Sequence, residues 1–189
     1  MNLNTTYMGI PLKNPIVPSA SPMSENVDNI RRMADAGASA VTMFSIFEEQ
    51  LRIEAAALDH YTSLGDNIYS ESTSFFPKGD DYHIAPTRYL DIIHRASEAV
   101  DIPIIGSLNG ISNEGWIDYA SQIEQAGARA LELNIFMLPT DPHISGTRVE
   151  ESYLDIVKAV KEIVTIPVAV KMNPFFSSIA HMADRKSVV

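Results

Sequence analysis

The chain has 189 residues, of which 46% are hydrophobic and 20% charged, the composition of an ordinary globular domain. Its formal net charge of −10 argues against nucleic acid as a partner, because phosphate binding requires clustered lysine and arginine. The absence of cysteine excludes disulfides, thiolate metal ligands and cysteine nucleophiles. No apolar run approaches the roughly 20 residues of a membrane helix and the first residues lack a signal-peptide pattern, so we expect a cytoplasmic protein with no membrane partner.

Short apolar runs alternate with amphipathic stretches along most of the chain. Five runs are continuously apolar, as buried parallel strands are: residues 15–19, 40–44, 103–107, 130–134 and 167–171. Four stretches between or after them have helical spacing: from Ser24, an expected N-cap, to Gly37, then about 87–99, 113–126 and 149–164. Repeated strand–helix units predict an α/β fold with a parallel sheet.

The joints between these units repeat in sequence. Residues 35–38 (Asp-Ala-Gly-Ala) resemble residues 125–128 (Gln-Ala-Gly-Ala), and each set precedes a predicted strand. The sheet could close as a barrel or remain open. A dinucleotide-binding open sheet is disfavoured, because no Gly-x-Gly-x-x-Gly follows the first predicted strand.

Residues 46–86 interrupt the alternation. Residues 46–58 could form a helix with a charged, solvated face, whereas residues 63–86 are rich in Ser, Gly, Asp and aromatic residues and predict a long loop. Long loops in compact domains are commonly lids or binding loops, although a disordered excursion is the alternative.

The sequence is short for a closed barrel. A complete eight-stranded β/α barrel takes about 250 residues, and the fifth predicted strand ends at Lys171. Residues 174–183 predict the opening of a further helix, and we interpret 184–189 as a non-native tail, with a natural short tail as the alternative. We therefore expect 1–183 to be an incomplete barrel domain, and its unpaired strand edges to favour a homo-oligomer.

Polar residues gather where the predicted strands end, which is where β/α barrels carry their chemistry. Lys171 ends an apolar run, and a buried ammonium requires a partner: an anionic ligand, Glu132, or solvent reached by its long stem. Asn134 could bind the edge of a heterocycle or cap a turn. The same alternative, ligand contact or turn, applies to the remaining strand-end candidates, which are Ser19, Ala20, Ser21 and Asn109.

Other catalytic signatures are absent from the sequence. The five histidines show no metal-ligand spacing, and no Gly-x-Ser-x-Gly nucleophile elbow is present. We therefore predict no metal site.

Three segments resemble the dihydroorotate dehydrogenase family in the order and spacing that the family has: residues 3–17 (LNTTYMGIPLKNPIV), 130–134 (ALELN) and 168–171 (VAVK). The resemblance implies a TIM-barrel (β/α)8 type of fold, here its N-terminal part of about five strands with a small N-terminal β-hairpin. It also implies an FMN-dependent oxidoreductase acting on a CH–CH bond of a small pyrimidine-type substrate. By this resemblance Asn134 would contact flavin and substrate, Lys171 would lie against the flavin pyrimidine ring, and Ser19, Ala20, Ser21 and Asn109 would line the cofactor site.

The chain departs from the family at three places. Where soluble members carry a Cys or Ser base, residues 135–139 read Ile-Phe-Met-Leu-Pro, none of which accepts a proton. Phe44 stands where many members have a flavin-contacting Lys, and the loop that supplies a substrate-binding Asn reads SESTSFFP at 70–77. The catalytic base is therefore unassigned, and Glu71 and Ser72 are candidates for the base and for contact with the substrate.

Two other functions stay open. One is a Schiff-base lyase barrel that uses Lys171, and the other is a non-catalytic barrel fragment. The family's phosphate grip comes from its last two strands, so we expect the 189-residue chain alone to retain no FMN and to be inactive.

Overall fold

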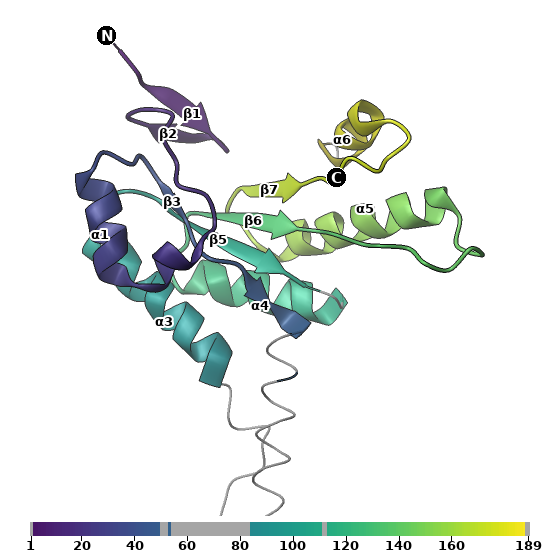
Figure 1. Cartoon of the computed structure of the whole chain (residues 1–189), viewed down its shortest axis with the longest axis horizontal. Helices are drawn as coiled ribbons and strands as arrows, with labels where there is room; N and C mark the ends of the chain where they lie inside the picture. The colour runs from purple at the N-terminus through teal and green to yellow at the C-terminus, as the bar shows by residue number, and fades with distance from the viewer. Residues whose placement is uncertain (1, 50–52, 54–83, 111–112, 188–189) are drawn as a thin grey trace, which may run out of the picture.

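A computed structural model describes residues 2–49, 53, 84–110 and 113–187 of the chain. Its centre is a parallel sheet in the order β3-β5-β6-β7, formed by Val41–Thr42, Ile104–Asn109, Ala130–Asn134 and Val168–Lys171. A further short strand, β4 (Ile46–Phe47), pairs with the end of β5. The predicted α/β fold with about five parallel strands is confirmed, as an open part of a barrel in the described residues (Figure 1).

Helices cover one face of this sheet. They are α1 (Val27–Asp35), α3 (Ile84–Ala99), α4 (Asn113–Gln125) and α5 (Gly146–Ile163). The main core lies between these helices and the sheet, because alternate strand residues such as Ile104, Leu108, Leu131 and Leu133 face the helices and are buried.

The opposite face of the sheet carries the N-terminal hairpin. β1 (Thr5–Tyr7) and β2 (Ile10–Leu12) are antiparallel and are joined by Met8 and Gly9, with φ of 52° and 76°, as a type I′ turn requires. Leu12 packs there against Ala40, Ile105 and Ala130, which alternate with the helix-facing residues. The hairpin that the family resemblance implied is confirmed.

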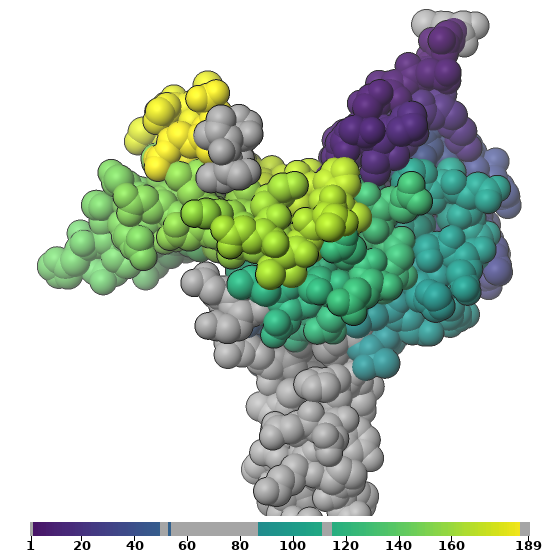
Figure 2. All heavy atoms as spheres, turned by 180° about the vertical axis from the view of Figure 1, so that it is seen from behind, coloured from purple at the N-terminus to yellow at the C-terminus, as the bar shows by residue number. Residues whose placement is uncertain are grey.

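The C-terminal helix α6 (Ile179–Ser187) lies on the same side as the hairpin. Figure 2 shows the hairpin and α6 rising from the body as two separate projections, with a hollowed surface between them. That hollow lies over the face of the sheet that the helices leave uncovered.

The first predicted strand, residues 15–19, is not a regular strand. Its segment lies beside β3, since Ser39 N donates to Ile16 O (2.9 Å) and Thr42 N donates to Pro18 O (3.0 Å). The donors are three residues apart and the acceptors two, so the ladder is irregular, and Pro15 and Pro18 have no N–H to add to it. The apolar run was recognised correctly, but its two prolines prevent the regular pairing.

Several predicted boundaries were also wrong. Asn26, not Ser24, caps α1, because its side chain accepts from Asp28 N, while Ser24 is buried in a 3₁₀ turn (Pro22–Glu25). Residues 46–47 form β4 rather than a helix, and helix is described at 48–49 and 53 only.

The later helices differ from their predicted extents as well. α3 begins at Ile84, inside the predicted loop 63–86, and the rest of that loop lies outside the described residues. α6 begins at Ile179 rather than near 174 and continues through Ser187, with Arg185 Nη1 3.0 Å from Glu150 Oε2 on α5. Residues 184–187 therefore belong to α6, and the interpretation of 184–189 as a non-native tail stays a prediction.

Candidate functional site

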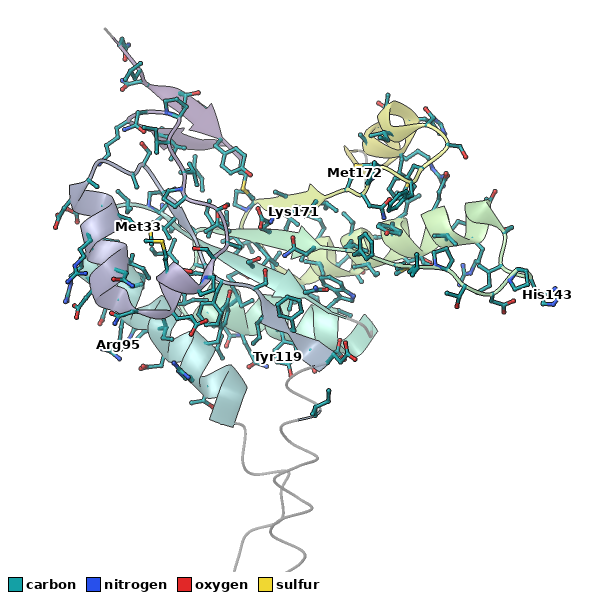
Figure 3. All side chains as sticks on the ribbon, viewed as in Figure 1. Met33, Arg95, Tyr119, His143, Lys171 and Met172 are labelled. Atoms are coloured by element: carbon teal, nitrogen blue, oxygen red, sulfur yellow. The ribbon has the colours of Figure 1, made fainter. Side chains whose placement is uncertain are left out.

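The carboxyl ends of β5, β6 and β7 bring polar residues together, among them the predicted Asn134 and Lys171. Asn134 on β6 is paired in register with Lys171 on β7, and Ser107 on β5 is paired with Glu132 on β6. Registered neighbours in a parallel sheet lie on the same face, so all four side chains are on the face that carries the hairpin. Figure 3 labels Lys171 beside β7.

Two serine hydroxyls and the Asn134 amide form a closed triangle at this edge. Asn134 Nδ2 lies 3.0 Å from Ser45 Oγ and 3.1 Å from Ser107 Oγ, and the two hydroxyls are 2.8 Å apart. Ser107 is fully buried, whereas Ser45 and Asn134 are half-buried and reach the surface of the site.

The triangle depends on a break between β3 and β4. At Phe44 and Ser45 the chain leaves the ladder with β5, and Phe44 N donates instead to Ser24 Oγ at 2.7 Å. The Tyr89 hydroxyl from α3 fills the gap, since it donates to Ser107 O (3.0 Å) and accepts from Ser107 N (2.9 Å). Burial raises the pKa of Tyr89 well above its ordinary value, so this hydroxyl keeps its proton.

Lys171 and Glu132 form an ion pair beside the triangle. Lys171 Nζ lies 2.8 Å from Glu132 Oε1, and the lysine side chain is 52% exposed while the glutamate is 12% exposed. The contact is not aligned as a hydrogen bond, and Glu132 Oε1 is buried without another partner among the described residues. Glu132 Oε1 is therefore held against the Lys171 ammonium and shielded from the surface of the site.

Glu132 also lines a pocket of about 320 Å³ between the sheet and the hairpin. Ser19 and Thr42 contribute to the same wall. Of the predicted cofactor residues, Ser19 is thus near Glu132, whereas Ser21 O accepts from the backbone N–H and the hydroxyl of Ser24.

The remaining predicted residues are less informative. Ala20 is half-buried between the two serines, and Asn109 is half-buried at the end of β5. Glu71 and Ser72 lie outside the described residues. Ser45, Ser107 and Tyr89 were absent from the predicted site, although Ser107 carried a signal, as a polar residue within an apolar strand.

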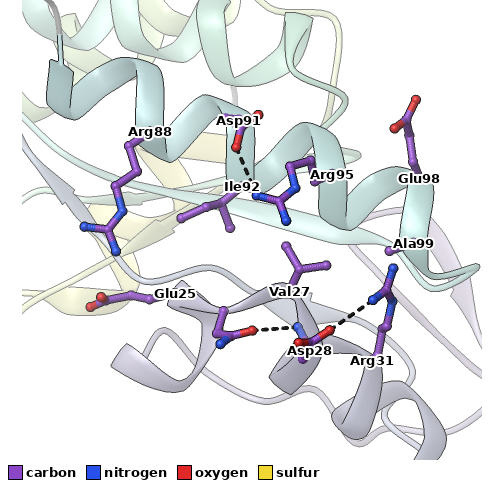
Figure 4. Close-up of a pocket in the computed structure, with 11 residues that line it drawn as sticks. Glu25, Val27, Asp28, Arg31, Arg88, Asp91, Ile92, Arg95, Glu98 and Ala99 are labelled. Atoms are coloured by element: carbon purple, nitrogen blue, oxygen red, sulfur yellow. Dashed lines mark hydrogen bonds and ion pairs between the residues drawn. The ribbon is translucent and has the colours of Figure 1, made fainter.

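A second pocket, about 610 Å³, lies between α1 and α3 in the helix layer (Figure 4). Surface ion pairs line it, including Arg31–Asp28 at 3.0 Å and Arg95–Asp91 at 3.3 Å. This pocket is separate from the strand ends, and four of its charged side chains form these two ion pairs.

No cluster of three or more His, Asp or Glu side chains that could hold a metal ion occurs among the described residues. Of the helices in the described part of the chain, none has both the length and the apolar character needed to cross a bilayer.

The donor set is compatible with a flavin. An isoalloxazine ring has carbonyl and ring-nitrogen groups along its pyrimidine edge. A site that binds this edge would need a cation, neutral hydrogen-bond donors and an acceptor. Lys171 supplies the cation, and the Ser45 hydroxyl and the Asn134 amide supply neutral donor and acceptor groups on the same face.

Sequence comparison finds relatives over nearly the whole chain, although no family model matches. The chain is 27% identical over 188 residues to the catalytic subunit of dihydroorotate dehydrogenase B (NAD(+)) of Thermoplasma acidophilum. It is 30% identical over 192 residues to the subunit of the same name from Methanocaldococcus jannaschii. Each match covers 96% of this chain but 58% of the relative, so the chain spans less than two thirds of their length.

Comparison of structures finds barrel enzymes. The dihydrodipicolinate synthase of Agrobacterium tumefaciens matches with a TM-score of 0.53 and 15% identity, over 92% of this chain and 48% of its own. The synthase of Aquifex aeolicus matches with the same TM-score and 12% identity, over 91% of this chain and 50% of its own. At this identity the likeness concerns the fold alone, and it agrees with part of a TIM barrel.

Proposed function

Starting from this relationship to the dihydroorotate dehydrogenases, we propose that the chain carries part of the flavin site of an FMN-dependent oxidoreductase. The reaction is the oxidation or reduction of a CH–CH bond in a pyrimidine-type substrate. The observation that carries the proposal is the register of Asn134 with Lys171, which puts these two residues side by side on one face at the carboxyl edge of the sheet.

Each residue has a distinct role in this proposal. The Lys171 ammonium provides positive charge beside the pyrimidine ring of the flavin, where negative charge develops on reduction. Glu132 holds the ammonium on the site face through the 2.8 Å ion pair. Bound FMN would supply the hydride acceptor, and Asn134 would position both ring systems.

The base that takes the substrate proton is not in the segment after β6. Ile135 in this segment is buried and Phe136 is exposed. None of the side chains from 135 to 139, which are Ile, Phe, Met, Leu and Pro, can accept a proton. The proposal therefore places the base elsewhere in the chain, with Glu71 and Ser72 as candidates for the base and for contact with the substrate.

Titration with lumiflavin, the isoalloxazine ring without the phosphate-bearing side chain, tests the proposal on this chain. We expect saturable quenching of the flavin fluorescence, and Lys171→Ala should weaken binding about three- to tenfold because it removes a charge-assisted contact. Lys158→Ala, an exposed lysine on α5, is the matched control and should leave the dissociation constant unchanged. Equal binding by Lys171→Ala and the unaltered chain would refute the proposed role of Lys171.

The lyase alternative has no observation in its favour. A Schiff-base lysine is activated by burial or by a second cation. The Lys171 side chain is 52% exposed, and its ion pair within the described residues is with a carboxylate. The similarity to dihydrodipicolinate synthases concerns the fold, so it does not support that chemistry.

A further inference from the structure

The outward side of α3 carries a stripe of charged side chains that alternate in sign. In chain order its members are Arg88, Asp91, Arg95 and Glu98. Intervals of three, four and three positions place all four on one face of a helix. All four are exposed, and they line the groove of about 610 Å³ between α1 and α3 (Figure 4).

This stripe is complementary to its own reverse. A two-fold axis that crosses α3 at the level of Ile93 would bring position 88 of one copy beside position 98 of another, and position 91 beside 95, because the members of each pair are equally far from 93. Arg88 would then meet Glu98 of the second copy, and Asp91 would meet its Arg95. Because a two-fold contact repeats each pairing, four ion pairs would form.

The two outer members of the stripe lack a permanently charged partner within one copy. Arg95 Nη1 lies 3.3 Å from Asp91 Oδ2, so the two inner members already pair. Among the described residues Glu98 pairs with the His94 ring, at 3.7 Å, and that ring is charged only when protonated. Arg88 has no ion pair in the described part of the chain. The second copy would therefore supply partners for the two charges that need them.

The groove beside the stripe gives a second helix a place to lie. Figure 4 shows the apolar side chains of Val27 and Ile92 between the charged side chains of the two helices. On the α1 side, Arg31 and Asp28 form an exposed ion pair at 3.0 Å. A helix with a charged stripe can lie along such a groove, because its charges meet charged walls while the buried apolar residues lie beneath it.

We propose that α3 forms the contact of a two-fold homodimer, in which α3 of each copy lies antiparallel to α3 of the other along the groove. The complementarity of the stripe with its own reverse indicates a second copy of this chain as the partner. Because exposed ion pairs each contribute little, the dimer is weak and depends on the whole stripe. The contact lies in the helix layer, away from the strand ends, so it is independent of the proposed flavin site.

Variants in which the stripe carries a single sign test the proposal. Asp91→Arg with Glu98→Arg makes the stripe wholly basic. Arg88→Glu with Arg95→Glu makes it wholly acidic. Each variant alone should self-associate at least about tenfold more weakly than the parent chain, because like charges then face each other. A mixture of the two should associate at least as tightly as the parent, since every facing pair is then opposite in sign.

Inversion of all four signs is the matched control. It combines Arg88→Glu, Asp91→Arg, Arg95→Glu and Glu98→Arg. The net charge, the pairing of positions 91 and 95 and the self-complementary order are all preserved. The dissociation constant should therefore stay within about twofold of the parent value. This control separates the order of the charges from their number.

Fluorescence anisotropy of an N-terminally labelled chain, titrated with unlabelled chain, measures each dissociation constant. For the parent chain, an increase in salt from about 0.05 M to about 0.5 M should weaken association about tenfold, because exposed charges are screened. Pairing through strand edges or apolar loops does not involve these charges, so it would persist at the higher salt concentration.

Recovery of association in the mixture, with retention in the inverted variant, supports the α3 contact. Equal association of the parent and the single-sign variants overturns it, and so does a mixture that associates no better than its separate components. A parent chain that stays monomeric up to about 1 mM also overturns it. The samples contain no flavin, so each of these results leaves the proposed flavin site untouched.

Discussion

The Tyr89 hydroxyl occupies the place in the sheet where a neighbouring strand would otherwise bond to Ser107. It satisfies both backbone groups of Ser107, at 3.0 and 2.9 Å. Phe44 packs edge-on against its ring, with the centroids 4.9 Å apart. A phenol that is buried and bonded in this way contributes to stability only in its neutral form.

This buried phenol predicts a loss of stability at alkaline pH. Below pH 10.0, the ordinary pKa of tyrosine, both states keep the proton and the contribution is complete. Above it, the unfolded chain releases the proton while folded Tyr89 retains it, so the unfolded state binds fewer protons and the free energy of unfolding falls as pH rises.

Urea titrations at pH 8 and at about 10.5 measure this effect. Tyr89→Phe should be less stable at pH 8 by about 1–3 kcal/mol, because the Ser107 backbone groups lose their partner. The difference between variant and parent should narrow at the higher pH. A constant difference would contradict the assignment.

Single residues also show what the sequence could predict of the site. Asn134 and Lys171 were predictable, because a polar side chain at the end of an apolar strand is conspicuous. Ser45 was not, because its role depends on contacts with residues 62 and 89 positions away and on a break in the sheet. A serine after a strand otherwise looks like an ordinary turn residue.

Among the secondary-structure elements, β5 and α4 approach unusually closely at Gly106. A Cβ placed there would collide with the side chain of Ile123 on α4 and lie 3.5 Å from Leu131 Cδ1. Ile123 is fully buried, so it has little room to move. The glycine therefore determines how near the helix layer lies to the strand that carries Ser107.

We predict that Gly106→Ala destabilises the chain by about 1–3 kcal/mol through overpacking. Gly146→Ala is the matched control, because nothing lies within 4 Å of the new methyl group at the start of α5. That control should be neutral or slightly stabilising, since alanine is the better helix former. Equal effects in chemical denaturation would show that Ile123 accommodates the methyl group.

The elements were predicted best where one face is continuously apolar. The segments 113–126 and 130–134 match α4 and β6 within a residue. The failures have local causes that apolar periodicity does not register. Pro15 and Pro18 disrupt a strand, and Asn26 caps α1 two residues after the serine that was expected to do so.

At the scale of the whole molecule, β7 forms one edge of the described sheet. Leu131 N donates to Pro167 O, so the backbone groups of Pro167 point toward β6. Because the backbone N–H and C=O groups of successive strand residues point to opposite sides, those of Val168 and Val170 point away from β6. No described strand pairs with that side. Exposed apolar side chains lie on the loops after β6 and β7, including Phe136, Leu138 and Phe175. Such an edge is a template for pairing with another chain.

We therefore expect the chain to self-associate with increasing concentration, through β7. Val170→Pro removes an N–H that points away from β6 and has no acceptor among the described residues. The hydrogen bonds between β6 and β7 are kept, so this variant should shift the equilibrium toward the monomer. Val170→Ala loses similar packing but retains the N–H and serves as the control. Light scattering with size-exclusion chromatography measures both variants. If both are equally associated, the contact lies elsewhere, on the apolar loops rather than on the strand edge.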